Sequence, residues 1–217
     1  MAAPKITLYL DLVSPFAYIA YYVTRHSPVF AKCEITYIPI FLGGLFNATG
    51  NITPLRIKNK DKWIDIERKR WAKSLNIPIF PKVPDGFPIL TLGVQRTLAA
   101  LPPAKLIPAY DALYKAFWVE GNAAIGNAET YQPILEAAVG KEVAEEAVRQ
   151  SSTQAIKDKL SANTTKAFES GGFGVPWFVC TNSKGETEGF WGVDHLGQVA
   201  AFLGLDVGGD RGFRALM

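Results

Sequence analysis

The first apolar run of the chain covers residues 5–11 (Lys-Ile-Thr-Leu-Tyr-Leu-Asp) and is rich in β-forming residues. Its nearly continuous apolar character predicts a central strand that is buried on both faces. Helical spacing of apolar residues follows over 16–30, and a second β-rich run covers 34–40. This order predicts a β-α-β unit whose strands pair in parallel through a right-handed crossover.

The middle of the chain changes from sheet periodicity to helical periodicity. Segment 41–54 is rich in Gly and Asn and predicts a loop, and the closely spaced prolines within 77–88 predict another. Elsewhere in the middle, apolar residues recur at steps of three and four, which predicts helices. These helices are expected from about residue 55 onward and then over 90–101, 104–119, 128–138, 142–163 and 164–170.

Strand signals return toward the end of the sequence. Residues 177–180 and 187–191 flank the turn sequence Asn-Ser-Lys-Gly at 182–185 and predict a β-hairpin, followed by a helix over 194–203. The order βαβ, helices, ββα predicts an α/β chain with a thioredoxin-like fold that is interrupted by an all-helical insertion domain. We expect two thioredoxin-like parts at 1–54 and 171–217, with the helical insertion domain at 55–170.

Composition and charge indicate a globular protein and argue against several other classes. The 217 residues are 48% hydrophobic and 20% charged, which is typical of a globular chain and not of a disordered one. The net charge of +3 is spread along the sequence, so no nucleic-acid-binding arm is indicated, and no apolar run reaches the length of a membrane span. Cys33 and Cys180 have neither C-x-x-C nor metal-ligand spacing, so we expect no disulfide framework and no metal.

Candidate chemistry begins where the first strand meets the first helix, at Ser14-Pro15-Phe16. A helix that starts there directs its unpaired N–H groups and the positive end of its dipole at whatever lies above residue 14. An anion is favoured at such a place, and Ser14 adds a hydroxyl donor. Ser14 could equally be only the N-cap of the helix.

A second candidate is the Gly-rich sequence 171–175 that leads to Pro176 and the third strand. Proline is compatible here with a trans peptide at a strand edge, the commoner form, or with a cis peptide. In the second case Val175 could offer its N–H and C=O to an extended peptide ligand, in the manner of an added strand.

Taken in order, five segments resemble the kappa-class glutathione transferases over nearly the whole chain. They are 11–16 (Asp-Leu-Val-Ser-Pro-Phe), 42–51, 60–63, 171–176 and 190–194. The resemblance implies a DsbA-type thioredoxin fold with a helical insertion, which that family shares with the related 2-hydroxychromene-2-carboxylate isomerases.

The resemblance also implies an activity. Ser14 and Ala17 stand where disulfide oxidoreductases of this fold carry C-x-x-C, so dithiol chemistry is excluded at this junction. Instead, Ser14 is implied to hydrogen-bond the sulfur of glutathione, the co-substrate. The thiolate would then attack a small electrophile or a hydroperoxide, as in detoxification.

Further glutathione contacts follow from the resemblance. Asn51 and Lys60 are implied to contact the ligand's backbone and carboxylate end, and Val175, before a cis Pro176, to pair with its cysteinyl unit. The γ-glutamyl end is expected at the start of the last helix. The remaining residues that the resemblance assigns to this site are Phe16, Val193, Asp194 and His195.

The sequence departs from the family pattern at several of these positions. Val193 and His195 replace a hydroxyl and an arginine, Trp177 is bulkier than expected, and Lys58 or Lys62 could take the place of Lys60. Alternatives therefore stay open: a glutathione-dependent isomerase of the related type, or a non-catalytic protein with a thioredoxin-type peptide- or thiol-binding groove. We expect a homodimer without nucleic-acid or membrane partners. The expected compartment is the cytoplasm, with mitochondria or peroxisomes as other possibilities. The sequence Ala-Leu-Met at 215–217 is only a weak indication of peroxisomal targeting.

Overall fold

The computed structural model describes residues 2–208, 210 and 213 of the chain. Its four strands form one mixed sheet in the order β2-β1-β3-β4. The central strand β1 (Lys5–Leu10) runs parallel to β2 (Glu34–Pro39) and antiparallel to β3 (Trp177–Thr181), which pairs in turn with β4 (Thr187–Trp191). The predicted βαβ unit, hairpin and central first strand are therefore confirmed.

The first helix, α1 (Pro15–His26), is shorter than the prediction of 16–30. A separate 3-10 turn covers Pro28–Phe30, and the Ser27 hydroxyl accepts a hydrogen bond from the Val29 N–H. The predicted end of the helix was wrong because Pro28 has no N–H to continue the helical ladder.

Helix α2 (Leu42–Thr49) stands where the sequence predicted a loop, so that prediction was wrong. Two glycines and an asparagine give this segment weak intrinsic helix propensity. Tertiary contacts supply the stability instead: the Leu42 N–H donates to the carboxylate of Asp11 at 2.8 Å, and Leu45 is fully buried. Gly50 ends the helix in the left-handed conformation at φ 69°, which glycine adopts without strain.

The other helices fall close to their predicted places, except that the break expected between 163 and 164 is wrong, because α8 (Gln154–Glu169) runs through it, and that a break occurs earlier. The predicted single helix over 142–163 is interrupted at 151–153, where Thr153 caps the next helix by accepting from the Ile156 N–H at 3.4 Å. The bounds are α3 (Lys60–Ser74), α4 (Leu92–Ala100), α5 (Pro103–Tyr114) with a π-helical turn at Lys115–Val119, α6 (Ala128–Val139), α7 (Lys141–Gln150), α8 (Gln154–Glu169) and α9 (Leu196–Phe202).

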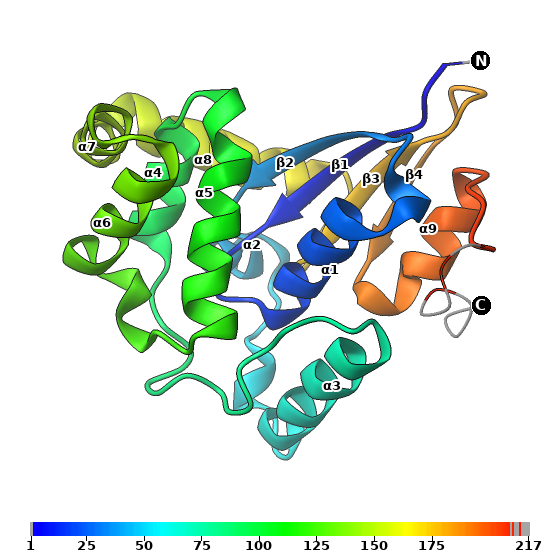
Figure 1. Ribbon diagram of the computed structural model, residues 1–217, viewed down its shortest axis with the longest axis horizontal. Coiled ribbons are helices and arrows are strands. Elements are labelled where there is room, and N and C mark those ends of the chain that lie inside the picture. The colour runs from blue at the N-terminus through cyan, green and yellow to red at the C-terminus, as the bar shows by residue number, and fades with distance from the viewer. Residues whose placement is uncertain (1, 209, 211–212, 214–217) are drawn as a thin grey trace.

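Helices surround the sheet unevenly. Helices α4 to α8 gather beside β2, whereas α1 lies in front of the sheet, with α9 to its right and α3 below it (Figure 1). The junction between β1 and α1 therefore lies where the two groups of helices meet. The division into domains at 54/55 and 170/171 stays a prediction, and residues 215–217 lie outside the described part of the chain.

Candidate functional site

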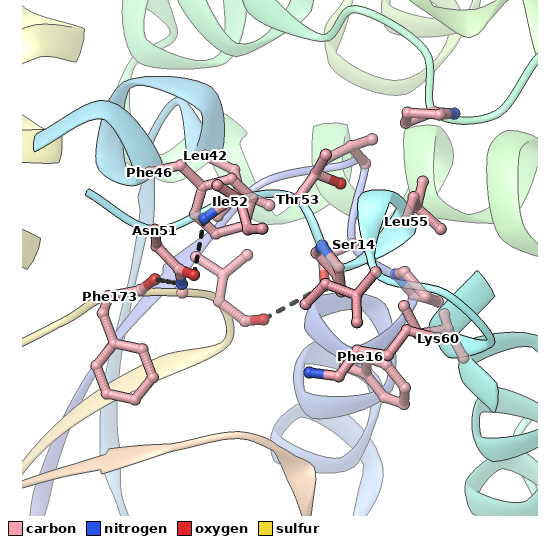
Figure 2. A pocket seen from close by; sticks show the side chains of 18 of the residues that line it. Ser14, Phe16, Leu42, Phe46, Asn51, Ile52, Thr53, Leu55, Lys60 and Phe173 are labelled. Carbon is pink, nitrogen blue, oxygen red and sulfur yellow. Dashed lines mark hydrogen bonds between the residues drawn. The ribbon is translucent and has the colours of Figure 1, made fainter. Parts of the chain in front are cut away.

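A cavity of about 740 Å³ opens at the β1–α1 junction. Its walls come from segments far apart in sequence, which Figure 2 shows around a shared space. The lining residues used below are Ser14 and Phe16 from the junction, Asn51, Ile52, Ile57, Lys60 and Trp63 from the α2–α3 region, Phe87 from the proline-rich loop, and Phe173, Val175 and Trp191 from the hairpin side.

Ser14 is only 7% exposed and makes two hydrogen bonds through its hydroxyl group. The oxygen accepts from the Ala17 N–H at 3.1 Å, which is the predicted N-cap, and the hydroxyl donates to the Val175 carbonyl at 3.4 Å. A donor–acceptor distance of 3.4 Å is long for a hydroxyl, so this bond is weak and its proton is available to a stronger acceptor.

The N-terminus of α1 offers a second donor beside Ser14. Pro15 has no N–H, and the N–H groups of Ala17 and Tyr18 are bonded to the side chain and backbone of Ser14. Within the described residues, this leaves the Phe16 N–H as the unpaired donor of the first turn. Such a donor at the positive end of a helix dipole favours an anion in the cavity.

The fully buried carboxylate of Asp11 links three segments next to Ser14 by hydrogen bonds. One of its oxygens accepts from the Val13 N–H at 3.1 Å and the Thr91 hydroxyl at 2.7 Å, and the other accepts from the Leu42 N–H at 2.8 Å. Burial raises the pKa of Asp11 to about 6, although these three hydrogen bonds act to lower it. Asp11 thus fastens the start of α2 and the start of α4 to the end of β1. Its role was not predicted.

The backbone before Ser14 is anchored by two more buried side chains. The Trp118 Nε1–H donates to the Leu12 carbonyl at 2.9 Å, and the Gln95 amide donates to the Leu10 and Ile40 carbonyls at 2.9 and 2.5 Å. Both side chains are fully buried. Each carbonyl between Leu10 and Leu12 therefore has a fixed partner, since the Asp11 carbonyl accepts from the Ser14 N–H at 3.1 Å.

Asn51 and Lys60 both line the cavity, Asn51 beside Phe173 and Lys60 on the other side of Ser14 (Figure 2). The Asn51 amide donates to the Phe173 carbonyl at 2.9 Å and its oxygen accepts from the Ile52 N–H at 2.8 Å, so the side chain links the segment after α2 to the segment before β3 (Figure 2). Lys60 begins α3, is exposed, and forms no ion pair with any described residue. Its neighbours Lys58 and Lys62 do not line the cavity.

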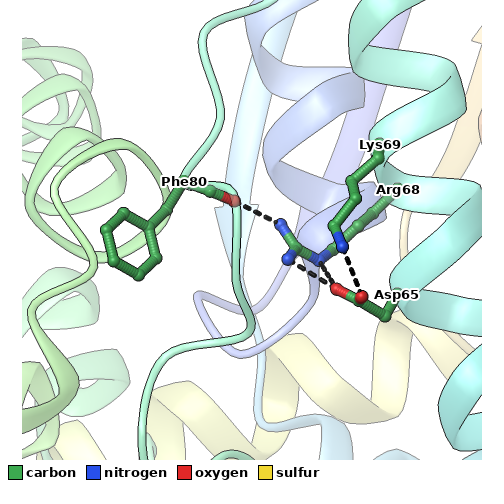
Figure 3. A network of polar contacts seen from close by, with 4 residues as sticks. All are labelled: Asp65, Arg68, Lys69 and Phe80. Atoms are coloured by element: carbon green, nitrogen blue, oxygen red, sulfur yellow. Dashed lines mark hydrogen bonds and ion pairs between the residues drawn. The ribbon is translucent and has the colours of Figure 1, made fainter.

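Helix α3 is fixed against the proline-rich loop by Arg68. This buried guanidinium donates to the Phe80 carbonyl at 2.8 Å and pairs with Asp65 at 2.6 Å, and Lys69 contacts the same carboxylate (Figure 3). Charge-assisted bonds of this kind are stronger than neutral ones. They hold the loop that carries Phe87, a further wall of the cavity.

The segment before β3 completes the polar side of the cavity. The Val175–Pro176 peptide bond is cis, as one of the two alternatives predicted. The Val175 carbonyl accepts from Ser14, while its N–H has no partner among the described residues. Pro176, also predicted for the site, is buried and does not line the cavity, and its carbonyl accepts from the Gly192 N–H at 3.1 Å.

Val193, Asp194 and His195 do not line this cavity. They form a 3-10 turn that leads into α9 and contacts α1. Val193 is buried, whereas Asp194 is exposed with its Oδ1 3.4 Å from the His195 Nδ1. The structure therefore places these three predicted residues outside the cavity, just after its lining residue Trp191 in the sequence.

Large apolar side chains around the mouth of the cavity were not predicted as a group. Ile52 is 51% exposed, Trp63 53% and Trp191 42%, and the Phe173 ring lies 4.9 Å from that of Trp191. Exposed apolar residues gathered at one opening indicate a surface for an apolar ligand. Trp177, in contrast, is buried and its Nε1–H donates to the Ser170 hydroxyl at 2.9 Å, so it packs in the core.

Other reactive groups do not reach the cavity. Burial raises the pKa of the Cys33 thiol to about 11 and that of Cys180 to about 12, so both stay protonated at neutral pH. Among the described residues, no group of three or more His, Cys, Asp or Glu could hold a metal ion, and no helix has the length and apolar character needed to cross a membrane.

Comparisons with known proteins agree on one family. The DSBA-like thioredoxin domain matches residues 5–204. Glutathione S-transferase kappa 2 of Caenorhabditis elegans is 30% identical over 207 residues, 91% of this chain and 91% of that protein, and kappa 1 of the same organism is 27% identical over 215 residues, 92% and 91% of the two chains. In fold, the chain is similar to a 2-hydroxychromene-2-carboxylate isomerase, with a TM-score of 0.76 over 92% of this chain and 94% of that one at 22% identity. The chain belongs to the DSBA-like thioredoxin family and, within it, to the kappa-class glutathione S-transferases.

Proposed function

We propose that this protein is an enzyme that binds glutathione with its sulfur above Ser14 and activates it as a thiolate. The observation that carries the proposal is the pair of donors at the N-terminus of α1, the Ser14 hydroxyl and the Phe16 N–H, beside the cavity. Neither cysteine of the chain lies there, so a thiol nucleophile has to come from the ligand.

The interaction energies of these two donors are large enough to lower the pKa of a bound thiol below neutral pH. A free thiol has a pKa near 8.5, and each unit of lowering corresponds to about 1.4 kcal/mol of preference for the thiolate. A helix dipole supplies about 0.3–1 kcal/mol and a hydrogen bond to a charged group about 1.5–3 kcal/mol. Together they lower the pKa by about two units, so that most of the bound thiol is ionised at neutral pH.

The rest of glutathione is proposed to lie along the polar side of the cavity. The free Val175 N–H would pair with the cysteinyl unit, as in an added strand. Lys60, which is exposed and without an ion pair in the described chain, would meet a carboxylate, and Asn51 would contact the ligand beside it. The γ-glutamyl end would extend past Pro176 to Val193, Asp194 and His195, where Asp194 offers a carboxylate to its ammonium group.

The proposed reaction is a nucleophilic substitution. The thiol proton passes to solvent, the thiolate sulfur forms a bond to an electrophilic carbon, and the leaving group departs with the bonding electrons. With a hydroperoxide, the sulfur attacks one oxygen and the O–O bond breaks to release an alcohol. A second glutathione then gives the disulfide and water. The apolar mouth of the cavity would hold the electrophile.

Kinetics of Ser14→Ala test the proposal. With glutathione and an aryl chloride, we expect kcat/KM to fall about 10- to 100-fold at pH 7, because a charged hydrogen bond of about 1.5–3 kcal/mol is lost. The deficit should narrow above about pH 9, where the unassisted thiol ionises. Thr53→Val, which removes another hydroxyl from the cavity lining, is the matched control.

The same assay separates the alternatives. An unaltered rate in Ser14→Ala would remove Ser14 from the mechanism. An isomerase would convert a cis-alkene acid without consuming glutathione, and a non-catalytic protein would bind glutathione saturably without turnover of any electrophile or hydroperoxide.

We also propose a homodimer. The exposed side of α3 carries Trp63 and Ile66, 53% and 43% exposed, which is an unusual amount of apolar surface for a helix facing water. Light scattering should give twice the chain mass, and a Trp63→Asp, Ile66→Asp double variant should give the monomer. A monomeric wild-type protein would contradict this.

A further inference from the structure

A second cavity, of about 300 Å³, lies between α2, α4 and α8. It is separate from the glutathione cavity, because the two use different faces of α2. Phe41, Gly44 and Ala48 recur at helical spacing on the side of the second cavity, whereas Leu42 and Phe46 line the first. A volume of about 300 Å³ is at the lower end of the range for small-molecule sites.

The polar lining of the second cavity is cationic. Arg96 of α4 and Lys157 of α8 both line it, and it has no acidic lining residue. Neither cation forms an ion pair or a side-chain hydrogen bond with any described residue. The Arg96 Nε is moreover buried without a hydrogen-bond partner. A buried donor on a charged group is rarely left unpaired in a native protein, so a partner from outside the chain is indicated.

The remaining walls are mostly apolar. Phe41, Leu92 and Leu160 come from three different segments around the cavity, and Phe168 at its edge is 43% exposed. The hydroxyls of Ser161 and Thr165 lie on the same side of α8 as Lys157. Cationic donors on one side and apolar rings on the other match a ligand with one charged end and one apolar end.

From this arrangement we propose that the second cavity binds a small amphipathic carboxylate, an aromatic or short alkyl acid. The guanidinium fork of Arg96 matches the two oxygens of one carboxylate, and Lys157 adds a point charge. The apolar body of the acid would cover the rings of Phe41 and Phe168. Because this site shares no lining residue with the first cavity, the proposal does not depend on glutathione chemistry.

Calorimetric titration of the full chain with phenylacetate tests the proposal, with phenylacetamide and inorganic phosphate as comparison probes. We expect saturable binding of phenylacetate that weakens with added salt, at least about tenfold weaker binding of the neutral amide, and weaker binding of phosphate, which lacks the apolar body. Arg96→Met and Lys157→Met should each weaken phenylacetate binding about tenfold.

Two controls define the site. Lys166→Met removes an exposed cation of α8 outside this cavity and should leave phenylacetate binding unchanged, as should Ser14→Ala. Absence of saturable binding up to about 10 mM phenylacetate, equal binding of the amide, tighter binding of phosphate, or binding that survives both cation variants would overturn the proposal. If Arg96→Met does not fold, Lys157→Met, at a half-buried position, and its Lys166→Met control still decide whether phenylacetate binds in this cavity.

Discussion

The two walls of the cavity at the β1–α1 junction are built in opposite ways. On the wall of the β1–α1 junction, Asp11, Gln95 and Trp118 are fully buried and hold the backbone before Ser14 by hydrogen bonds. On the wall formed by residues 51–64, Ile52 and Trp63 are more than half exposed. The backbone beside Ser14, where we propose the reaction, is thus fixed by buried polar contacts, whereas the wall proposed to meet the electrophile is an exposed apolar surface.

Truncating a buried anchor should have the largest effect. Trp118→Ala is expected to lower the free energy of unfolding by about 3–5 kcal/mol, through a cavity and the lost Nε1–H bond to the Leu12 carbonyl. Trp118→Phe keeps most of the volume and should lose about 1–3 kcal/mol by leaving that carbonyl unpaired. Urea denaturation measures both, with the exposed-wall variant Ile52→Ala, expected to change the free energy of unfolding by no more than about 0.5 kcal/mol, as the control. Equal losses of unfolding free energy for variants of the two walls would contradict the proposed difference between them.

Ionisation of the buried Asp11 should make the stability of the protein depend on pH. Burial raises the pKa of Asp11 from 3.8 to about 6, so its contribution to stability is full below pH 3.8 and is lost as pH rises through about 6. Between about pH 3 and about pH 7, the free energy of unfolding of the wild type should therefore fall by about 3 kcal/mol relative to that of Asp11→Asn. Denaturant titrations at a series of pH values measure this difference. Asp85→Asn, which removes an exposed carboxylate outside the network, is the matched variant, and a pH-independent difference for Asp11→Asn would contradict the prediction.

The smallest effects are expected at the exposed mouth. Trp191 is already 42% exposed, so Trp191→Ala should leave stability and kcat nearly unchanged and raise KM for an aromatic electrophile about three- to tenfold. Leu90→Ala removes an even more exposed apolar side chain outside the cavity and should not change KM. Steady-state kinetics with a small and a bulky electrophile test this. An equal change of KM for both electrophiles would argue against an apolar surface at the mouth.

The two walls also differ in how far the sequence predicts them. Local patterns indicated the strand-to-helix junction at Ser14 and the hairpin after Pro176, because periodicity and cap residues lie within a few positions. Helix α2 was missed because distant residues stabilise it. Its Leu42 N–H bonds to Asp11, 31 residues away, and the Phe41 N–H bonds to the Thr164 hydroxyl, 123 residues away. Asp11 itself was missed for the same reason, since one aspartate at a strand end gives no sign that Thr91 will reach it.

The central claim is that the junction lowers the pKa of a glutathione thiol. The most direct test is the ultraviolet difference spectrum of glutathione added to the protein and titrated across pH. The account predicts a saturable thiolate absorbance with an apparent pKa about two units below that of free glutathione, and a rise of about one to two units in Ser14→Ala. A bound thiol that titrates at its free value in the wild type, or identically in Ser14→Ala, would contradict it.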